Sequence, residues 1–270
     1  MTVELFERSQ RIRRRIVDAC AGPTGGHLGG SLSCTDILTV LYFAVLRVEP
    51  DRPDDPDRDI FLLSKGHAAI ALYATLEERG FVPAGELSRY GRPGSRMTGH
   101  PVRAVPGVEM PTGSLGHGLA LGLGFALSAR LAGRSSRVFV VVGDGELQEG
   151  SCWEALQCAA AHRADNLVSI VDRNGLQQAG LTEEVSPLEP LADRLRAFGW
   201  AVREVDGHDH AALAEALSTV PWKAGHPSAL IARTVKGMGV PMLAGRVASH
   251  YVTLNERNHS RALRQLGGAP

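Results

Sequence analysis

The sequence predicts an α/β fold, a mostly parallel sheet with helices on both faces. Two short apolar runs carry this prediction, VFVVVG at 138–143 and LVSIVD at 167–172, with a helical stretch from Glu149 to His162 between them. Short β-branched runs are typical of strands buried in a parallel sheet. The crossover between two such strands is right-handed, and both strands end at the same edge of the sheet. A chain of 270 residues with 44% hydrophobic side chains suits one large domain, which we assign to residues 1–270.

The same patterns place the other elements. Small residues at Gly118, Gly122 and Gly124 predict a helix that packs closely against another backbone. In chain order, we further expect a helix at 3–21, a helix from 33 or 35 to 46, a strand at 60–63, a helix up to 79, a helix at 191–198, a strand at 200–204, a helix at 211–217 and a strand at 228–233, followed by a glycine-rich and then polar tail. The first helix carries a run of arginines that we expect on its solvated face: Arg11, Arg13, Arg14 and Arg15.

Composition excludes several classes of partner. Lys+Arg and Asp+Glu both number 29, and this zero net charge argues against nucleic acid or a membrane surface. No segment approaches the roughly 18 apolar residues of a membrane span, and the N-terminus lacks the apolar core of a signal peptide. The cysteines show no metal-ligand spacing, so we interpret them as reduced, buried thiols of a cytoplasmic protein: Cys20, Cys34, Cys152 and Cys158.

Polar residues follow the two apolar runs where the predicted strands end. Asp144 lies between Gly143 and Gly145 directly after the first run, and Asn174 follows the second. A carboxylate, an amide oxygen and a nearby backbone carbonyl, such as that of Leu176, are ligands that suit Mg²⁺ and leave room for phosphate. The alternative is an ordinary strand–turn–helix in which the aspartate only caps the helix.

Histidines recur after glycine. Six of the ten histidines do so, a pattern that favours a polar active-site wall on loops over scattered loop histidines: His27, His67, His100, His117, His208 and His226. No pair has the HExxH spacing, so we propose no zinc site.

The motif GDG followed by Asn resembles the thiamine diphosphate motif, and the wider pattern resembles the transketolase family. The resemblance runs from about Arg11 to Asn255 and rests on motifs in the family's order: GGHLGGSLS, SKGHA, TGHP, PGVE, TGSLGHGL, GDGELQEG, DRN and DGHD. It implies the thiamine diphosphate-binding fold, with thiamine diphosphate and Mg²⁺, or Ca²⁺, as cofactors.

The resemblance also implies a role for individual residues. The metal ligands would be Asp144, Asn174 and the carbonyl of Leu176. The cofactor would contact Gly113, Leu115, Gly143, Asp144, Gly145, Glu146 and Asn174, with His67 and His250 at its diphosphate. The catalytic groups would be His27 and His100, at the sugar hydroxyls and the reacting carbonyl, and Glu149, which with Glu154 would relay to the activating glutamate of a partner subunit.

The sequence departs from the family at several positions. The last histidine is followed by Tyr251, where the family usually has glycine, and His117 replaces a common glutamine. Gln178 and Ala179 stand where an aliphatic residue and aspartate are frequent. The chain also ends at Pro270, whereas a full transketolase continues into a pyrimidine-binding domain that supplies the activating glutamate.

We therefore expect the N-terminal subunit of a split transketolase, active with a pyrimidine-domain partner in a heterotetramer of two copies of each subunit. It would transfer a two-carbon ketol unit from a ketose phosphate to an aldose or another acceptor. One alternative delivers that unit to a carrier protein. The α subunit of a 2-oxo acid dehydrogenase is disfavoured by SKGHA and the Gly-His loops. A cofactor-binding scaffold without catalysis is disfavoured by the retained Asp144, Asn174 and histidines.

Overall fold

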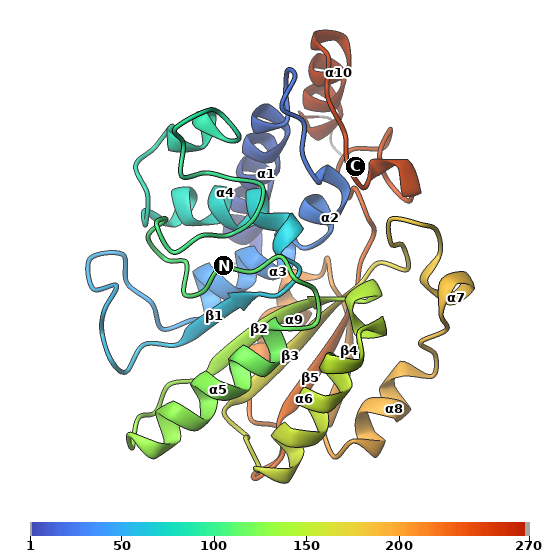
Figure 1. Cartoon of the computed structure of the whole chain (residues 1–270). Coiled ribbons are helices and arrows are strands. Elements are labelled where there is room, and N and C mark those ends of the chain that lie inside the picture. Colours follow the sequence, from blue (N-terminus) through green and yellow to red (C-terminus); the bar gives the residue numbers. More distant parts are fainter. Residues whose placement is uncertain (1, 268–270) are drawn as a thin grey trace.

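A parallel sheet organises residues 2–267, the part of the chain that this computed structural model describes (Figure 1). Its five strands are ordered β1-β2-β3-β5-β4, and every neighbouring pair is parallel. The strands are β1 (Ile60–Leu63), β2 (Val138–Gly143), β3 (Leu167–Arg173), β4 (Ala201–Asp206) and β5 (Ser228–Arg233). The predicted α/β class is confirmed, and β2 and β3 lie side by side as the apolar runs require.

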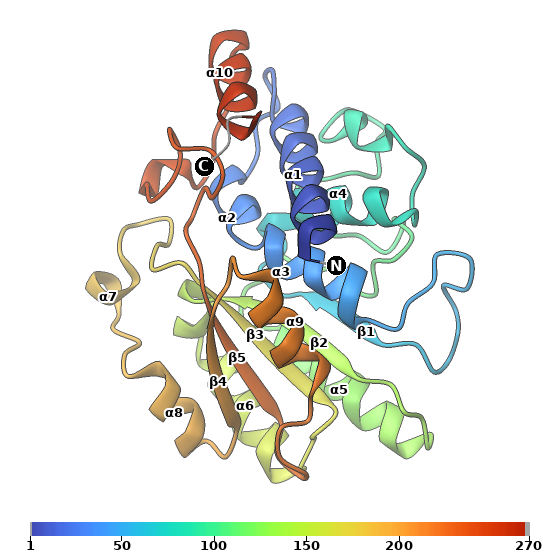
Figure 2. The same cartoon turned by 180° about the vertical axis from the view of Figure 1, so that it is seen from behind.

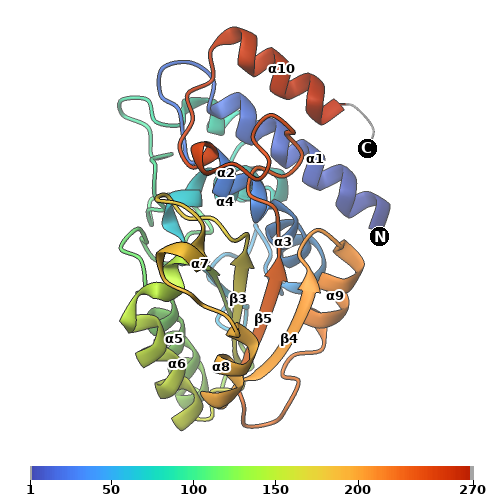
Figure 3. The same ribbon diagram turned by 90° about the vertical axis from the view of Figure 1, so that its right-hand side faces the viewer.

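Helices cover both faces of the sheet (Figures 1 and 2). Successive side chains of β2 point to opposite faces of the sheet. Val140 packs with the layer of α5, α6 and α8, whereas Val141 packs with the layer of α1, α3, α4 and α9. The edge-on view shows the sheet between these layers (Figure 3). The first layer is α5 (Gly118–Leu131), α6 (Gly150–Ala161) and α8 (Leu191–Ala197); the second is α1 (Thr2–Ala19), α3 (Thr35–Val40), α4 (Ala69–Arg79) and α9 (His210–Ser218).

Short elements complete the chain: α2 (Leu28–Ser33), the π-helix η1 (Leu41–Val45), the 3-10 turns η2 (Gly66–Ala68), η3 (Glu86–Arg89), η4 (Gly145–Gln148) and η5 (Val247–Ser249), and the helices α7 (Thr182–Val185) and α10 (Glu256–Gly267). The single helix expected from residue 33 or 35 to 46 is divided between α3 and η1, where the Leu46 N–H bonds the Leu41 carbonyl, and α2 precedes it. Among the described residues, no helix is both long and apolar enough to cross a bilayer.

The glycines of α5 explain how closely that helix approaches the sheet. A Cβ added to Gly122 would lie 2.5 Å from Val140 Cγ2, and one added to Gly118 would lie 2.3 Å from Ser64 Oγ. At Gly124 the added Cβ would meet nothing within 4 Å. The predicted close packing is therefore confirmed for Gly118 and Gly122, while Gly124 faces open space.

Two expectations were wrong. Arg13 is buried rather than solvated, because α1 packs against α3 and its guanidinium pairs with Asp36 at 2.9 and 2.5 Å. Cys158 is exposed, on the outer side of α6, whereas the other cysteines are buried. Beyond the tail, no element was predicted for residues 256–267, which fold as α10; this helix lies along α1 and buries Ala262. Its polar composition concealed a narrow apolar stripe.

Candidate active site

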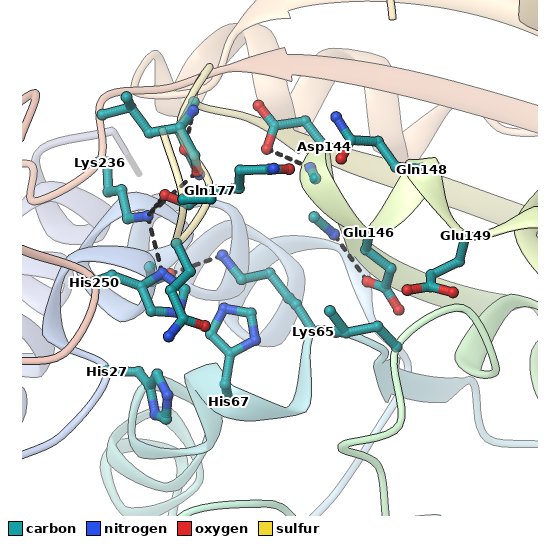
Figure 4. A pocket seen from close by; sticks show the side chains of 18 of the residues that line it. His27, Lys65, His67, Asp144, Glu146, Gln148, Glu149, Gln177, Lys236 and His250 are labelled. Carbon is teal, nitrogen blue, oxygen red and sulfur yellow. Dashed lines mark hydrogen bonds between the residues drawn. The ribbon is translucent and has the colours of Figure 1, made fainter. Parts of the chain in front are cut away.

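A pocket of about 420 Å³ opens at the carboxyl edge of the sheet (Figure 4). The segments that follow β1, β2, β3 and β5 supply most of its wall, together with residues 27–30 and 113–115. The carboxyl edge of a parallel sheet is where α/β proteins bind ligands, and a volume of this size accommodates one small organic molecule.

The structure brings nearly all of the predicted site residues to this pocket. The residues that line it are His27, His67, Gly113, Leu115, Gly143, Asp144, Gly145, Glu146, Glu149, Asn174, Leu176 and His250. His100 does not line the pocket but lies beside it. Its ring centroid is 6.3 Å from that of His27, and a Cβ on Gly113 would lie 2.8 Å from its Cδ2. The roles of these residues stay predictions.

Asp144 and Asn174 reach the same pocket because β2 and β3 end together, with Gly143 paired to Asp172. The Asp144 carboxylate accepts hydrogen bonds from the N–H groups of Gly145 (2.8 Å) and Gly175 (2.6 Å). Burial, and then the nearby Asp172, raise the pKa of Asp144 above its usual value. A buried carboxylate of this kind gains from a bound cation.

The donors near Asp144 fit a hard cation. The amide oxygen of Asn174 accepts the Leu176 N–H at 3.1 Å, and both residues line the pocket. Within residues 2–267 no group of three or more His, Cys, Asp or Glu could hold a metal, so a site here would use one carboxylate with amide and carbonyl oxygens. Such a set suits Mg²⁺ or Ca²⁺ better than zinc.

Sequence reasoning missed Arg173, which contacts Asp144. Its guanidinium lies 3.1 Å from the Asp144 carboxylate and also bonds Thr182 (2.7 Å), Glu183 (2.7 Å) and Glu189 (3.2 Å). The side chain is 7% exposed. Arg173 therefore ties the tip of β2 to the α7 segment and orients the carboxylate. The sequence signal that could have identified Arg173 is its place as the basic residue of the DRN motif.

Lys65 was also missed, although it lies inside the SKGH motif. Its ammonium group donates to Asp172 and to the Gly30 carbonyl at 2.8 Å, and Asp172 also accepts from Ser33 at 2.6 Å. Burial alone would lower the pKa of Lys65, but the Asp172 carboxylate outweighs it and raises that pKa. This buried ion pair supports the floor of the pocket.

Lys236 is the second buried lysine of the pocket, and it follows β5 closely. It donates to the carbonyl of Leu176 at 3.2 Å and to Nδ1 of His250 at 3.0 Å (Figure 4). Burial, and then Lys65, lower its pKa to about 8. A cation just after a strand at the ligand-binding edge was the signal that could have identified it. Two buried cations at one pocket favour an anionic ligand.

The histidines gather on one side of the pocket. The ring of His27 lies 5.2 Å from that of His67 and 5.3 Å from that of His250, measured between centroids. Burial, then neighbouring charges, lower the pKa of both His27 and His250 to about 4, and burial also lowers the pKa of His67. These imidazoles are therefore neutral at pH 7 and can each donate and accept one hydrogen bond.

The predicted histidine wall is only partly confirmed. Of the histidines that follow glycine, His27 and His67 line the pocket, and His100 lies beside it. The ring of His208 bonds Asp36, and that of His226 bonds the Gly199 carbonyl. Both therefore support other parts of the fold.

The two glutamates of the GDGELQEG motif differ in their surroundings. Glu146 is buried and accepts hydrogen bonds from the Ser64 hydroxyl and from the N–H groups of Gly116 (2.9 Å) and Gly143 (3.0 Å). These bonds join three segments of the pocket wall. Glu149 lines the pocket as well but is exposed at its edge, directly before α6.

An α/β sheet with two buried lysines, a buried carboxylate and neutral histidines at its carboxyl edge is typical of proteins that bind a phosphorylated cofactor. Residues 7–270 match the family model described as transketolase, thiamine diphosphate binding domain. The chain belongs to the transketolase family.

The similar proteins include two kinds, separate transketolase subunits of nearly this chain's length and a longer solved transketolase. The apulose-4-phosphate transketolase of Phocaeicola vulgatus has a subunit that is 41% identical over 267 residues, which are 98% of this chain and 95% of that protein. The 6-deoxy-6-sulfo-D-fructose transketolase subunit SqwG of a Clostridium species is 37% identical, over 98% of this chain and 96% of that protein. The solved transketolase of Leishmania mexicana superposes with a TM-score of 0.90 at 30% identity, over 97% of this chain but only 41% of that chain.

Proposed function

We propose that this chain is the N-terminal subunit of a split transketolase that binds thiamine diphosphate with Mg²⁺ or Ca²⁺. The observation that carries the proposal is the pocket, which gathers the cofactor-side residues at one sheet edge. The relatives that are named as transketolase subunits have nearly this chain's length, whereas the solved transketolases are more than twice as long. The chain thus spans about two fifths of the solved enzymes it matches.

The residues of the pocket divide into binding groups. Asp144, Asn174 and the Leu176 carbonyl would hold the metal, and Lys236 and His250 lie where a diphosphate would need donors. Thiamine diphosphate supplies an electron sink for cleavage of the carbon–carbon bond of a ketose. The protein binds and orients that ketose, excludes water and moves protons.

Histidines suit the proton-transfer part of this function. His27 contributes to the pocket wall, and His100 lies behind it, with its ring 6.3 Å from that of His27. A neutral imidazole can accept a proton from a sugar hydroxyl and return it to a developing alkoxide. We therefore assign His27 and His100 to the hydroxyl groups and the reacting carbonyl of the ketose.

The partner subunit would cover the open side of the pocket. Glu149 is exposed at the edge, where it can meet an acidic group of a pyrimidine domain. Exposed apolar side chains lie within three residues of pocket-lining positions: Leu181, Val235, Val247 and Tyr251. Apolar surface around a pocket favours a protein interface. A heterotetramer with two copies of each subunit, located in the cytoplasm, completes the proposal.

The substrates are proposed from the relatives. Their names include apulose-4-phosphate and 6-deoxy-6-sulfo-D-fructose, which are anionic sugars, so we propose an anionic ketose as donor and an aldose as acceptor. Most contacts to the anionic end would come from the partner.

The test is an activity measurement with purified subunits. The chain is assayed with Mg²⁺, thiamine diphosphate, an anionic ketose and an aldose, alone and with a pyrimidine-domain subunit encoded next to it. Turnover is expected only for the pair. Full turnover by the chain alone would overturn the split arrangement. Transfer to a lipoyl or acyl carrier protein, with none to any aldose, would replace the aldose acceptor.

A further inference from the structure

Tyr251 covers one side of His27. The two rings meet edge to face, with centroids 5.0 Å apart and planes at 87°. His67 and His250 also contact the ring of His27, and both line the pocket. Tyr251 does not line the pocket, and 54% of it is exposed. The imidazole of His27 therefore lies between the pocket histidines and an exposed tyrosine.

The backbone holds this tyrosine in place. Its hydroxyl donates to the carbonyl of Thr24 at 2.7 Å. The residues beside it form an antiparallel bridge, in which Gly26 and Val252 exchange N–H to O bonds of 3.0 and 2.9 Å. A Cβ added to Gly25 would lie 3.1 Å from Tyr251 Cε1 and 2.9 Å from the Val252 carbonyl oxygen. The segment before His27 is thus packed tightly against the segment that carries Tyr251.

This contact depends on the side chain that distinguishes the sequence at residue 251. Where glycine follows the last histidine, as is usual in the family, nothing from that position can cover His27. Tyr251 is exposed, yet its ring contacts His27 and its hydroxyl makes a hydrogen bond. These contacts lie beside a histidine that the proposed function assigns to the substrate.

We propose that Tyr251 is a positioning residue, which holds the imidazole of His27 toward the pocket and closes its outer side. The donor ketose then meets His27 only from the pocket. This inference takes the identity of the ligand from the proposed function. The packing of the two rings is independent of that function.

The tyrosine also keeps water from His27. The ionisable groups that face this imidazole are His67, His100, His250, Lys65 and Lys236. Burial lowers the pKa of His27 from 6.5 to about 4, and the positive charge of neighbours adds to this effect. Removing the ring of Tyr251 would admit water, which favours the imidazolium and raises that pKa.

Steady-state kinetics of the two-subunit complex test the positioning role. Tyr251→Ala should raise KM for the ketose roughly 2- to 12-fold, the equilibrium factor that corresponds to an edge-to-face aromatic pair. The kcat should fall as well, because His27 is assigned to proton transfer and must keep its orientation in the transition state. Tyr251→Phe keeps the ring and should restore the parent KM. The partner subunit and the cofactor are present at saturating concentrations, so weaker association between the subunits does not affect the measured KM.

Leu131→Ala is the matched control, since it truncates an apolar side chain that is 91% exposed at the far end of α5. It should leave KM at the parent value. An unchanged KM in Tyr251→Ala, or an equal loss in Tyr251→Phe, would overturn the proposal.

A second readout needs no activity. In the full chain with ¹³C-labelled histidine, the pH midpoint of the His27 ring resonance should rise in Tyr251→Ala and stay at the parent value in Tyr251→Phe. A midpoint that does not move in Tyr251→Ala overturns the packing role even in an active enzyme. An inactive complex with the expected shift would instead count against the proposed function alone.

Discussion

Replacing Asp144 with asparagine separates metal binding from folding. The N–H groups of Gly145 and Gly175 bond the two different carboxylate oxygens, at 2.8 and 2.6 Å. The single amide oxygen of asparagine keeps an acceptor for one of them. It loses the negative charge that faces the pocket and Arg173. Arg173 retains Thr182 and other partners, so we expect the free energy of unfolding to fall by about 1–3 kcal/mol, the cost of the one N–H group left without an acceptor.

The loss should appear in cofactor affinity. Even a group that only supports a metal ligand contributes 10- to 100-fold to affinity, so a direct ligand should cost at least about 100-fold, or ~2.8 kcal/mol. At 100 times the parent Kd, bound cofactor stabilises the parent by about 2.7 kcal/mol, whereas a 100-fold weaker variant would gain about 0.4 kcal/mol. The assay is chemical denaturation of the complex with and without Mg²⁺ and thiamine diphosphate.

The alanine variant is the control for the backbone bonds. Asp144→Ala leaves two buried N–H groups without an acceptor, which should lower stability by about 2–6 kcal/mol without any ligand. Asp144→Asn keeps one acceptor and should lose about half as much. If Asp144→Asn gains as much from Mg²⁺ and cofactor as the parent does, Asp144 is not a metal ligand and the reasoning about this site is wrong.

Three further predictions concern the interface, the packing and pH. Glu149→Gln should weaken association with the partner or activation by it, because the exposed carboxylate at the pocket edge loses its charge; sedimentation and titrated activity measure this. Gly122→Ala should destabilise by about 1–3 kcal/mol in urea unfolding, because its Cβ would meet Val140, whereas Gly124→Ala should be neutral or up to about 1 kcal/mol stabilising. His250 is neutral in the folded chain, with its pKa lowered from 6.5 to about 4. The free energy of unfolding should therefore decrease as the pH decreases from 6.5 to 4, and this decrease should be smaller in His250→Gln.

Each of these has an outcome that contradicts it. An intact, fully active complex with Glu149→Gln would remove the interface role. Equal stability of the Gly122 and Gly124 variants would show that α5 can shift away from β2. The sign of the pH effect follows from burial, because the unfolded chain binds the proton first below pH 6.5. An identical pH profile for parent and His250→Gln would refute the burial of a neutral imidazole.

The elements that sequence reasoning placed best are those with strong local patterns. The strands at 60–63, 138–143 and 228–233 were predicted with the bounds that the structure has. These short, largely apolar runs are bounded by turn residues and are too short for a helical period to show. By contrast, α10 contains few apolar residues in a polar segment, so its contact with α1 could not be recognised locally.

The site was predictable where its residues follow strands. Asp144 and Asn174 meet at one edge because their strands are adjacent and parallel, a consequence of topology that one crossover already implies. Lys236 could not be paired with Leu176 in the same way, since β5 is far from β3 in sequence and its place beside β3 is a property of the sheet order.

By itself, the amino-acid sequence determined the fold class, the strand tips and the polar residues placed on them, since those depend on local apolar pattern and on the handedness of a crossover. Only the tertiary structure decided which charges are buried and paired. Arg13 with Asp36, Lys65 with Asp172 and Arg173 with Asp144 are joined by packing between distant segments. The physical reason is that a charge can be buried only against a partner, and partners distant in sequence are selected by the fold as a whole.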